Sequence, residues 1–153
     1  MAPTVNLFGP IDTILGAGVG FAYVFVIEVV LLVLVVANFL TRMRAHAQHR
    51  SQASDGADAI TRFLPHEATN VLIVLASLYY LTLEAHAGMV MSVLVLGMFL
   101  SDFFEFEARK VEARRDVELD LPKGAIAAAM LVLAYAAYQS LFFVVEGGVN
   151  AII

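Results

Sequence analysis

The amino-acid sequence predicts an all-α fold, a bundle of four transmembrane helices. The first observation is composition: 61% of the 153 residues are hydrophobic and only 15% are charged, whereas soluble domains have about 45–50% and 25%. The second is arrangement, because long apolar runs alternate with two polar segments that contain every Lys and Arg. A soluble domain of this length leaves much of its surface exposed and could not hide so many apolar residues. We therefore treat residues 1–153 as a single integral membrane domain surrounded by the lipid bilayer.

The first apolar run predicts a transmembrane helix at about residues 14–40, with Glu28 as its only charge. At a rise of about 1.5 Å per residue this helix exceeds a hydrocarbon core of about 30 Å. It must therefore tilt, or its Gly-rich start lies at the membrane interface. No Lys or Arg precedes the run, so we expect an uncleaved anchor and no signal peptide. The polar segment 41–65 that follows is predicted to be a cytoplasmic loop.

The second apolar run, residues 68–104, is too long for one span and predicts two helices, at about 66–85 and 88–116. The turn between them falls at the polar, Gly-containing patch 84–88. Glu105 and Arg109 are four residues apart, a spacing that stabilises helices. We therefore expect the third helix to continue beyond the membrane into a second cytoplasmic loop, residues 105–121. Leu121-Pro122 then begins a fourth, Ala-rich helix at about 122–145.

The basic residues predict the orientation. All nine Lys and Arg lie in the segments between the first and second helices and between the third and fourth helices. Lys and Arg in short loops favour the cytoplasmic side. We therefore expect a multi-pass protein of the cell membrane with both polar loops inside and the N-terminus and C-terminus outside.

An internal duplication is a further expectation. Residues 33–41 resemble residues 93–101 at an offset of 60, and residues 74–76 resemble residues 132–134 at an offset of 58, which pairs Tyr80 with Tyr138. Chance similarity between Val/Leu-rich runs is the alternative. If the duplication is genuine, the fold consists of two tandem helical hairpins in a parallel repeat, related by an axis along the membrane normal.

Glu28 is the main candidate functional residue, because a charged carboxylate at mid-membrane is costly and such residues face the protein interior. It is expected to share an intramembrane polar or ion site with other polar side chains of the helices. They are Asn70, Tyr79, Tyr80, Tyr135 and Gln139. Two interpretations stay open: a packing device made of hydrogen bonds between helices, or a group that handles ions or protons.

A cytoplasmic charge cluster is expected at the inner end of the third helix. It comprises Asp102, Glu105, Arg109, Lys110, Arg114 and Arg115. The acidic members are expected to pair with Arg109 and with Arg residues of the first loop. The chain has no Cys, and its four His have neither the mid-span depth of haem ligands nor the spacing of a metal site. No catalytic residue, metal or cofactor is therefore predicted, and no nucleic-acid partner.

Four segments resemble a family of short, uncharacterised membrane proteins of halophilic archaea. They are residues 103–114 (FFEFEARKVEAR), 122–125 (PKGA), 68–82 and 138–143. The resemblance covers most of the chain from about Leu7. It implies a multi-span membrane protein and no particular activity, ligand or catalytic residue.

Three function classes follow, none of them pointing to an enzyme. The first is an accessory or scaffold subunit of a membrane assembly, in a homo-oligomer or a larger complex, because Ala-rich faces permit close helix contacts. The second is a small oligomeric ion or proton transport protein that uses Glu28. The third, a redox or metal-linked protein, rests only on the histidines.

Overall fold

The computed structural model describes residues 7–20 and 24–152. These residues form five α-helices and one short 3-10 helix, and no β-strand apart from a single bridge between Gly18 and Phe25. The elements are α1 (Pro10–Leu15), α2 (Val26–Ala53), η1 (Ala57–Ala59), α3 (Leu64–Leu83), α4 (Ala85–Arg114) and α5 (Lys123–Asn150). The all-α prediction is confirmed.

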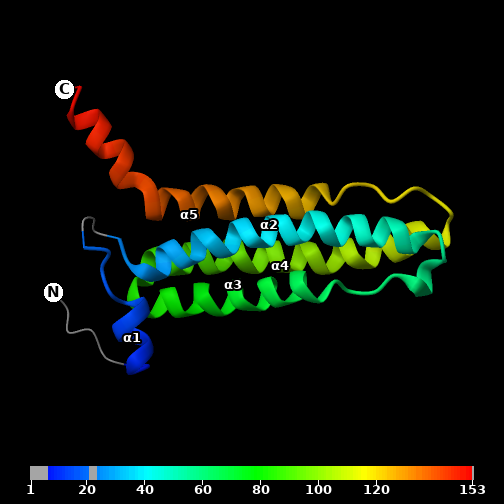
Figure 1. The fold of residues 1–153 in the computed structure, drawn as a ribbon, viewed down its shortest axis with the longest axis horizontal. Helices are drawn as coiled ribbons and strands as arrows, with labels where there is room; N and C mark the ends of the chain where they lie inside the picture. The colour runs from blue at the N-terminus through cyan, green and yellow to red at the C-terminus, as the bar shows by residue number, and fades with distance from the viewer. Residues whose placement is uncertain (1–6, 21–23, 153) are drawn as a thin grey trace.

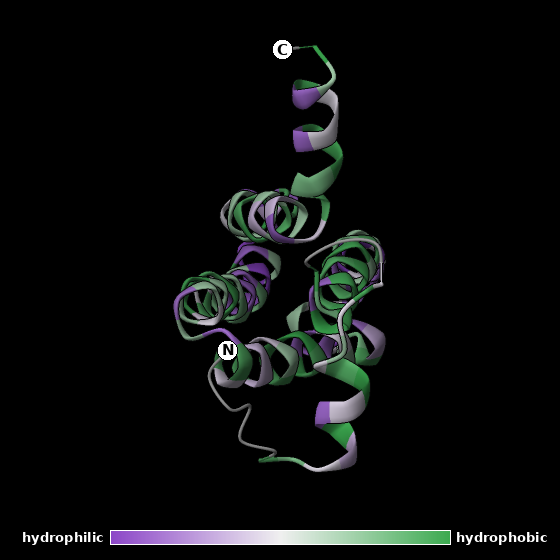
Figure 2. Cartoon of the chain, turned by 90° about the vertical axis from the view of Figure 1, so that its left-hand side faces the viewer, coloured by the Kyte–Doolittle hydropathy of each residue, from purple (hydrophilic) through white to green (hydrophobic). Residues whose placement is uncertain are grey.

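The four long helices, α2 to α5, lie side by side (Figure 1). Viewed end-on, they surround a common centre (Figure 2). α3 and α5 each pack against both α2 and α4, so α2 and α4 face one another across the centre. α1 and the C-terminal part of α5 lie at one end, and the α2–α3 and α4–α5 connections lie at the other (Figure 1). We call these the terminal end and the connection end.

Three of the described helices, α2, α4 and α5, are long and apolar enough to cross a membrane. α3 is not among them, because its 20 residues begin with a polar stretch that includes Pro65, His66, Glu67 and Asn70. The composition of the helices thus supports a membrane protein, while a fourth span is not established by this criterion.

The first long helix begins and ends later than the expected 14–40. α2 runs from Val26 to Ala53, and the short α1 precedes it. Gly16, Gly18 and Gly20 explain the late start, because glycine is unfavourable in a helix interior. Residues 41–53, expected as loop, are rich in Ala, Arg and Gln, which favour helix even outside a membrane. The first connection is therefore confined to residues 54–63, and includes η1.

The remaining helices lie near their expected positions. The helices expected at 66–85, 88–116 and 122–145 are α3, α4 and α5, and α5 extends to Asn150. A single residue, Glu84, separates α3 from α4. Gly88 permits this tight hairpin: a Cβ there would lie 2.2 Å from the Cα of Leu81.

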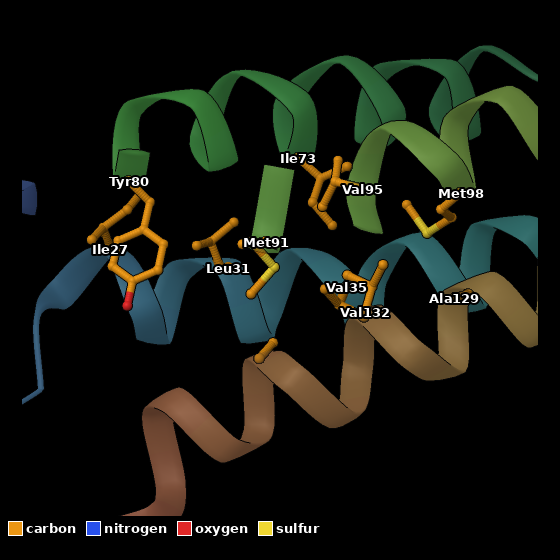
Figure 3. Packing of buried hydrophobic residues seen from close by; sticks show 11 residues of the cluster. Ile27, Leu31, Val35, Ile73, Tyr80, Met91, Val95, Met98, Ala129 and Val132 are labelled. Carbon is orange, nitrogen blue, oxygen red and sulfur yellow. The ribbon is translucent and has the colours of Figure 1, made fainter. Parts of the chain in front are cut away.

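An apolar core fills the centre of the four helices (Figure 3). α2 contributes Leu31 and Val35, and α4 contributes Met91, Val95 and Met98. Ile73 of α3 and Val132 of α5 complete a layer in which every side chain is at most 1% exposed. The outward faces of the same helices expose further large apolar side chains. This two-sided apolar pattern is typical of helices packed in lipid.

Candidate functional site

A stripe of polar residues continues the apolar face of α2 toward the connection end. Asn38, Arg42, His46 and His49 follow Leu31 and Val35 at intervals of three or four residues, and all are buried. This spacing keeps them on one helix face, directed at the centre of the four helices. α2 thus changes from apolar to polar packing along a single stripe.

Arg42 forms a two-pronged ion pair with Asp102 of α4, across the centre. Its Nε donates to Asp102 Oδ1 at 3.0 Å and its Nη2 donates to Oδ2 at 2.6 Å. The Arg42 side chain is 1% exposed and that of Asp102 is 10% exposed. His66 Nε2 lies 3.1 Å from Asp102 Oδ2 and must be the donor, because an ionised carboxylate only accepts. One carboxylate therefore joins α2, α3 and α4.

Hydroxyl and amide groups extend this network toward the apolar core. His66 Nδ1 lies 3.0 Å from Thr41 Oγ1, which lies 3.1 Å from Thr69 Oγ1. Asn38 Nδ2 donates to Thr69 Oγ1 at 3.0 Å and to Asn70 Oδ1 at 2.7 Å. The network consequently connects α2 and α3 at several levels.

A second pair lies one to two helical turns farther along. Arg109 Nη1 donates to His49 Nδ1 at 2.8 Å, and His49 Nε2 lies 2.9 Å from the carbonyl oxygen of Thr61. A carbonyl only accepts, so the proton of His49 is on Nε2, and Nδ1 is the acceptor for Arg109. His49 is therefore neutral, and the positive charge of Arg109 has no carboxylate as its direct partner here. We call the residues of both pairs and their hydrogen-bond partners the buried polar cluster. It comprises Asn38, Thr41, Arg42, His49, His66, Thr69, Asn70, Asp102 and Arg109.

Glu28 lies at the opposite, terminal end. It is the third residue of α2, where its Oε2 accepts from the backbone N–H of Phe25 at 2.8 Å. Its Oε1 accepts a short hydrogen bond from the hydroxyl of Tyr80 on α3. The expectation that Glu28 lies in the middle of its helix is wrong, because α2 starts only two residues before it. Its carboxylate instead satisfies a free N–H at a helix N-terminus.

The other expected members of an intramembrane site lie in separate places. Asn70 belongs to the buried polar cluster. Tyr79 donates to Asp12 Oδ1 at 2.8 Å, in the segment around α1. Gln139 donates to Tyr135 Oη at 2.9 Å within α5. The six residues are therefore not one site: Glu28 bonds with Tyr80, Gln139 bonds with Tyr135, and Asn70 and Tyr79 bond with residues outside the six.

The expected charge cluster also divides. Asp102 is largely shielded and Arg109 is buried, as described above, whereas Arg114 and Arg115 are exposed. Glu105 accepts from the backbone N–H of Gly124 at 3.3 Å, and the Lys110 ammonium lies 4.9 Å from the Phe106 ring centroid.

On the α4–α5 connection, Lys123 donates to Asp120 at 3.1 Å, which lowers the pKa of Asp120. The charges of this end therefore separate into a buried set and a surface set.

The pair of Asp102 with Arg42 agrees with the expectation that an acidic member of the charge cluster binds an Arg of the first loop. The sequence reasoning missed the burial of Arg42, His49 and His66 and their bonds to hydroxyl groups. Residues 41–65 are predicted to be a loop, and for this reason the side chains of Thr41, Arg42 and His49 are expected to face solvent. The signal was present, because Leu31, Val35, Asn38, Arg42, Ala45 and His49 repeat every three to four residues. Following that period through the polar residues predicts one continuous buried stripe.

The chemistry of this cluster is that of fixed charges and hydrogen bonds. Among residues 7–20 and 24–152, no three His, Cys, Asp or Glu are grouped to hold a metal ion. The cavity between Arg42 and Arg109 measures about 10 Å³, room for roughly one water molecule. A substrate of several atoms does not fit there. The arrangement can join helices and hold charge, and it offers no space for a reaction on a larger molecule.

The fold is a bundle of helices, three of which are long and apolar enough to cross a membrane, with a polar cluster in its interior. The chain belongs to a family described only as a domain of unknown function (DUF7313), whose model matches residues 2–153. The expected membership of an uncharacterised family is confirmed. No curated protein and no solved structure matches the chain.

Proposed function

We propose that this protein is an accessory or scaffold subunit of a membrane assembly, anchored by four transmembrane helices. The observation that carries the proposal is an interior that is sealed, combined with outward faces that are apolar. Both features suit a protein that binds other helices in the bilayer rather than one that moves a solute through its own centre.

The sealed interior weighs against the transport alternative. Glu28 and Tyr80 lie at the terminal end, and Arg42 and Asp102 lie toward the connection end. Between them lies the core layer of Leu31, Val35, Ile73, Met91, Val95 and Val132, at most 1% exposed. Such close-packed apolar side chains offer a proton or ion no polar partner. Glu28 is therefore assigned the packing role, as the acceptor for Tyr80 and Phe25.

The position of α3 supports a fourth span. α3 packs between α2 and α4, two helices apolar enough to cross a membrane. Its polar N-terminal residues His66, Thr69 and Asn70 are engaged in the buried polar cluster, so they do not face lipid. Val71, Leu72 and Leu75 on its outer face are more than half exposed. Burial of the polar groups by neighbouring helices removes the cost of placing them in a bilayer.

The distribution of charge supports the proposed orientation. All Lys and Arg lie between Arg42 and Lys123, in the halves of the helices and the connections at the connection end (Figure 1). The positive-inside tendency then places this end in the cytoplasm and the terminal end outside.

Burial supports the duplication, with one change of register. The buried residues Leu31, Val35 and His49 of α2 are each 60 positions before the buried Met91, Val95 and Arg109 of α4. In α3, buried Asn70, Ile73 and Ser77 are each 59 positions before buried Ala129, Val132 and Ala136 of α5. This register differs by one from the expected pairing of Tyr80 with Tyr138, of which Tyr80 is fully buried and Tyr138 is 55% exposed. If the two hairpins are a repeat, its axis passes between α2 and α4. The contact between Arg42 and Asp102 would then lie near this axis.

The C-terminal part of α5 is the proposed contact for a partner. Toward its C-terminus α5 turns away from the other helices (Figure 1), and Val144, Val145 and Val149 are exposed. Gly147 and Gly148 have nothing within 4 Å of a Cβ built at either position, so another helix could approach closely there. We propose that a second copy or another membrane subunit packs against this segment.

Native mass spectrometry after mild extraction from the membrane tests the proposal. The full chain should appear in a complex larger than the monomer, and a variant that ends after residue 143 should appear as a folded monomer. A full chain that is monomeric, with no partner in native membranes or in lipid nanodiscs, would contradict the scaffold role. Proton or cation flux in liposomes that Glu28→Gln abolishes would instead establish the transport alternative.

A further inference from the structure

The cavity beside the buried polar cluster has an unusual balance of charge. Arg42, Arg109 and Asp102 line it, together with His49, His66 and Phe106. The side chain of Arg42 is 1% exposed and Arg109 is 6% exposed. The Asp102 carboxylate already pairs with Arg42 through both oxygens, so a direct counter-charge for Arg109 must come from another group.

The remaining lining groups do not supply the missing negative charge. His49 is neutral, because Nδ1 accepts from Arg109 and Nε2 donates to Thr61. Glu67 is one-third exposed and pairs with Arg62 at 3.3 Å. Arg109 is attracted electrostatically by the carboxylates of Asp102, Glu105 and Glu112. None of the described carboxylates forms an ion pair with it.

Two nitrogens of these arginines are also without hydrogen-bond partners. Arg42 Nη1 and Arg109 Nε are buried, and no atom of the described residues accepts from either. A buried guanidinium with unused donors is unfavourable, and more so when no carboxylate contacts it directly, as at Arg109 among the described residues. The cavity that both side chains line is therefore a place where an acceptor with negative charge would stabilise the protein.

The size of the cavity restricts the class of acceptor. A volume of about 10 Å³ holds roughly one body of the size of a water molecule. Phosphate, sulfate and carboxylate metabolites are larger than this. A single water molecule fits the cavity but carries no charge. A monatomic anion is small enough to approach this size and also carries the negative charge.

We propose that this cavity binds one halide ion, chloride under ordinary conditions, between Arg42 and Arg109. The ion gives Arg109 a counter-charge in direct contact and accepts hydrogen bonds from the arginines. It is then a structural ligand that joins α2 and α4 across the centre of the molecule. This inference does not depend on the proposed scaffold role, since a folded monomer would contain the same cavity.

Thermal unfolding of the purified full chain tests the proposal, with chloride replaced by gluconate at constant ionic strength. Ligand that binds only the folded state raises the midpoint Tm with the logarithm of its concentration. Above the Kd, each tenfold increase in chloride should raise Tm by about 3–5 °C. In Arg109→Gln the dependence should disappear, because the amide can still donate to His49 but carries no charge. Arg50→Gln is the matched control: Arg50 is exposed and pairs with Glu118, so the chloride dependence should stay.

A Tm that is equal in chloride and gluconate, or a chloride dependence that persists in Arg109→Gln, would overturn the proposal. Should Arg109→Gln not fold, crystals of the native chain grown in bromide decide the matter. An anomalous peak between Arg42 and Arg109 supports the halide site. The absence of such a peak, with density for water there, refutes it.

Discussion

At the scale of residues, the Arg42–Asp102 pair is the buried ion pair that links α2 to α4. A buried ion pair contributes modestly relative to apolar residues of similar volume, but removal of one partner leaves an uncompensated charge. The pair also fixes His66, and through it Thr41. The Asp102 carboxylate of α4 thus binds side chains of both α2 and α3.

We therefore expect Asp102→Asn to lower the free energy of unfolding by about 3–5 kcal/mol, since Arg42 loses its counter-charge without leaving the interior. The double variant Arg42→Met with Asp102→Leu should recover most of that loss. Chemical unfolding in one detergent measures both. Glu118→Gln is the control, because its pair with Arg50 is exposed and contributes at most about 1 kcal/mol. An Asp102→Asn variant as stable as Glu118→Gln would mean that the ion pair does not organise the interior.

Residue-level prediction from the sequence succeeded where a polar side chain interrupts an apolar run. Glu28 was singled out for this reason, and Tyr80 was among its expected neighbours. Arg42, His49 and His66 were missed because their surroundings in the sequence are polar, so nothing locally distinguishes a buried Arg from a solvated one. Only the helical period of the whole stripe, from Leu31 to His49, carries that information.

At the scale of elements, the helix ends follow from helix propensity more than from hydropathy. The apolar run predicts a first helix at 14–40. Hydropathy indicates which residues are stable in lipid, but it does not determine at which residue the helical hydrogen bonds begin. Glycines delay α2 and good helix formers prolong it to Ala53. The ends of α3 and α4 were easier to predict, because Pro65 and the patch 84–88 interrupt both the hydropathy and the helix.

The α3–α4 hairpin gives a prediction at this scale. A methyl group added by Gly88→Ala would lie 2.2 Å from the Cα of Leu81, so the two helices must separate. We expect a loss of about 1–3 kcal/mol, as for other overpacked sites. Gly97→Ala, also inside α4, meets nothing within 4 Å and should gain about 0.5–1 kcal/mol from helix propensity. Equal Tm values for the two variants would show that α3 and α4 do not approach as closely as described.

At the scale of the whole molecule, the chain divides into an apolar middle and two polar ends. Glu28 and Tyr80 close the terminal end, the core layer fills the middle, and the buried polar cluster occupies the connection side. The sequence predicted the all-α class because composition is a property of the whole chain. It predicted that Asp102 pairs with an Arg of the first polar segment but not which one, because Arg42 and Asp102 are 60 residues apart and the packing of α2 across from α4 selects the pair.

The central claim, that four helices cross the bilayer, is tested most directly by the sides on which three positions lie. Single cysteines can be placed at Ser54 in the first connection, at His86 near the α3–α4 turn and at Asp116 in the second connection, since the native chain has none. An impermeant maleimide applied to intact cells should label the cysteine at 86 and not those at 54 and 116. Permeabilised cells should label all three, which controls for reactivity. If α3 does not cross, positions 54 and 86 will label alike, and that result would contradict the account.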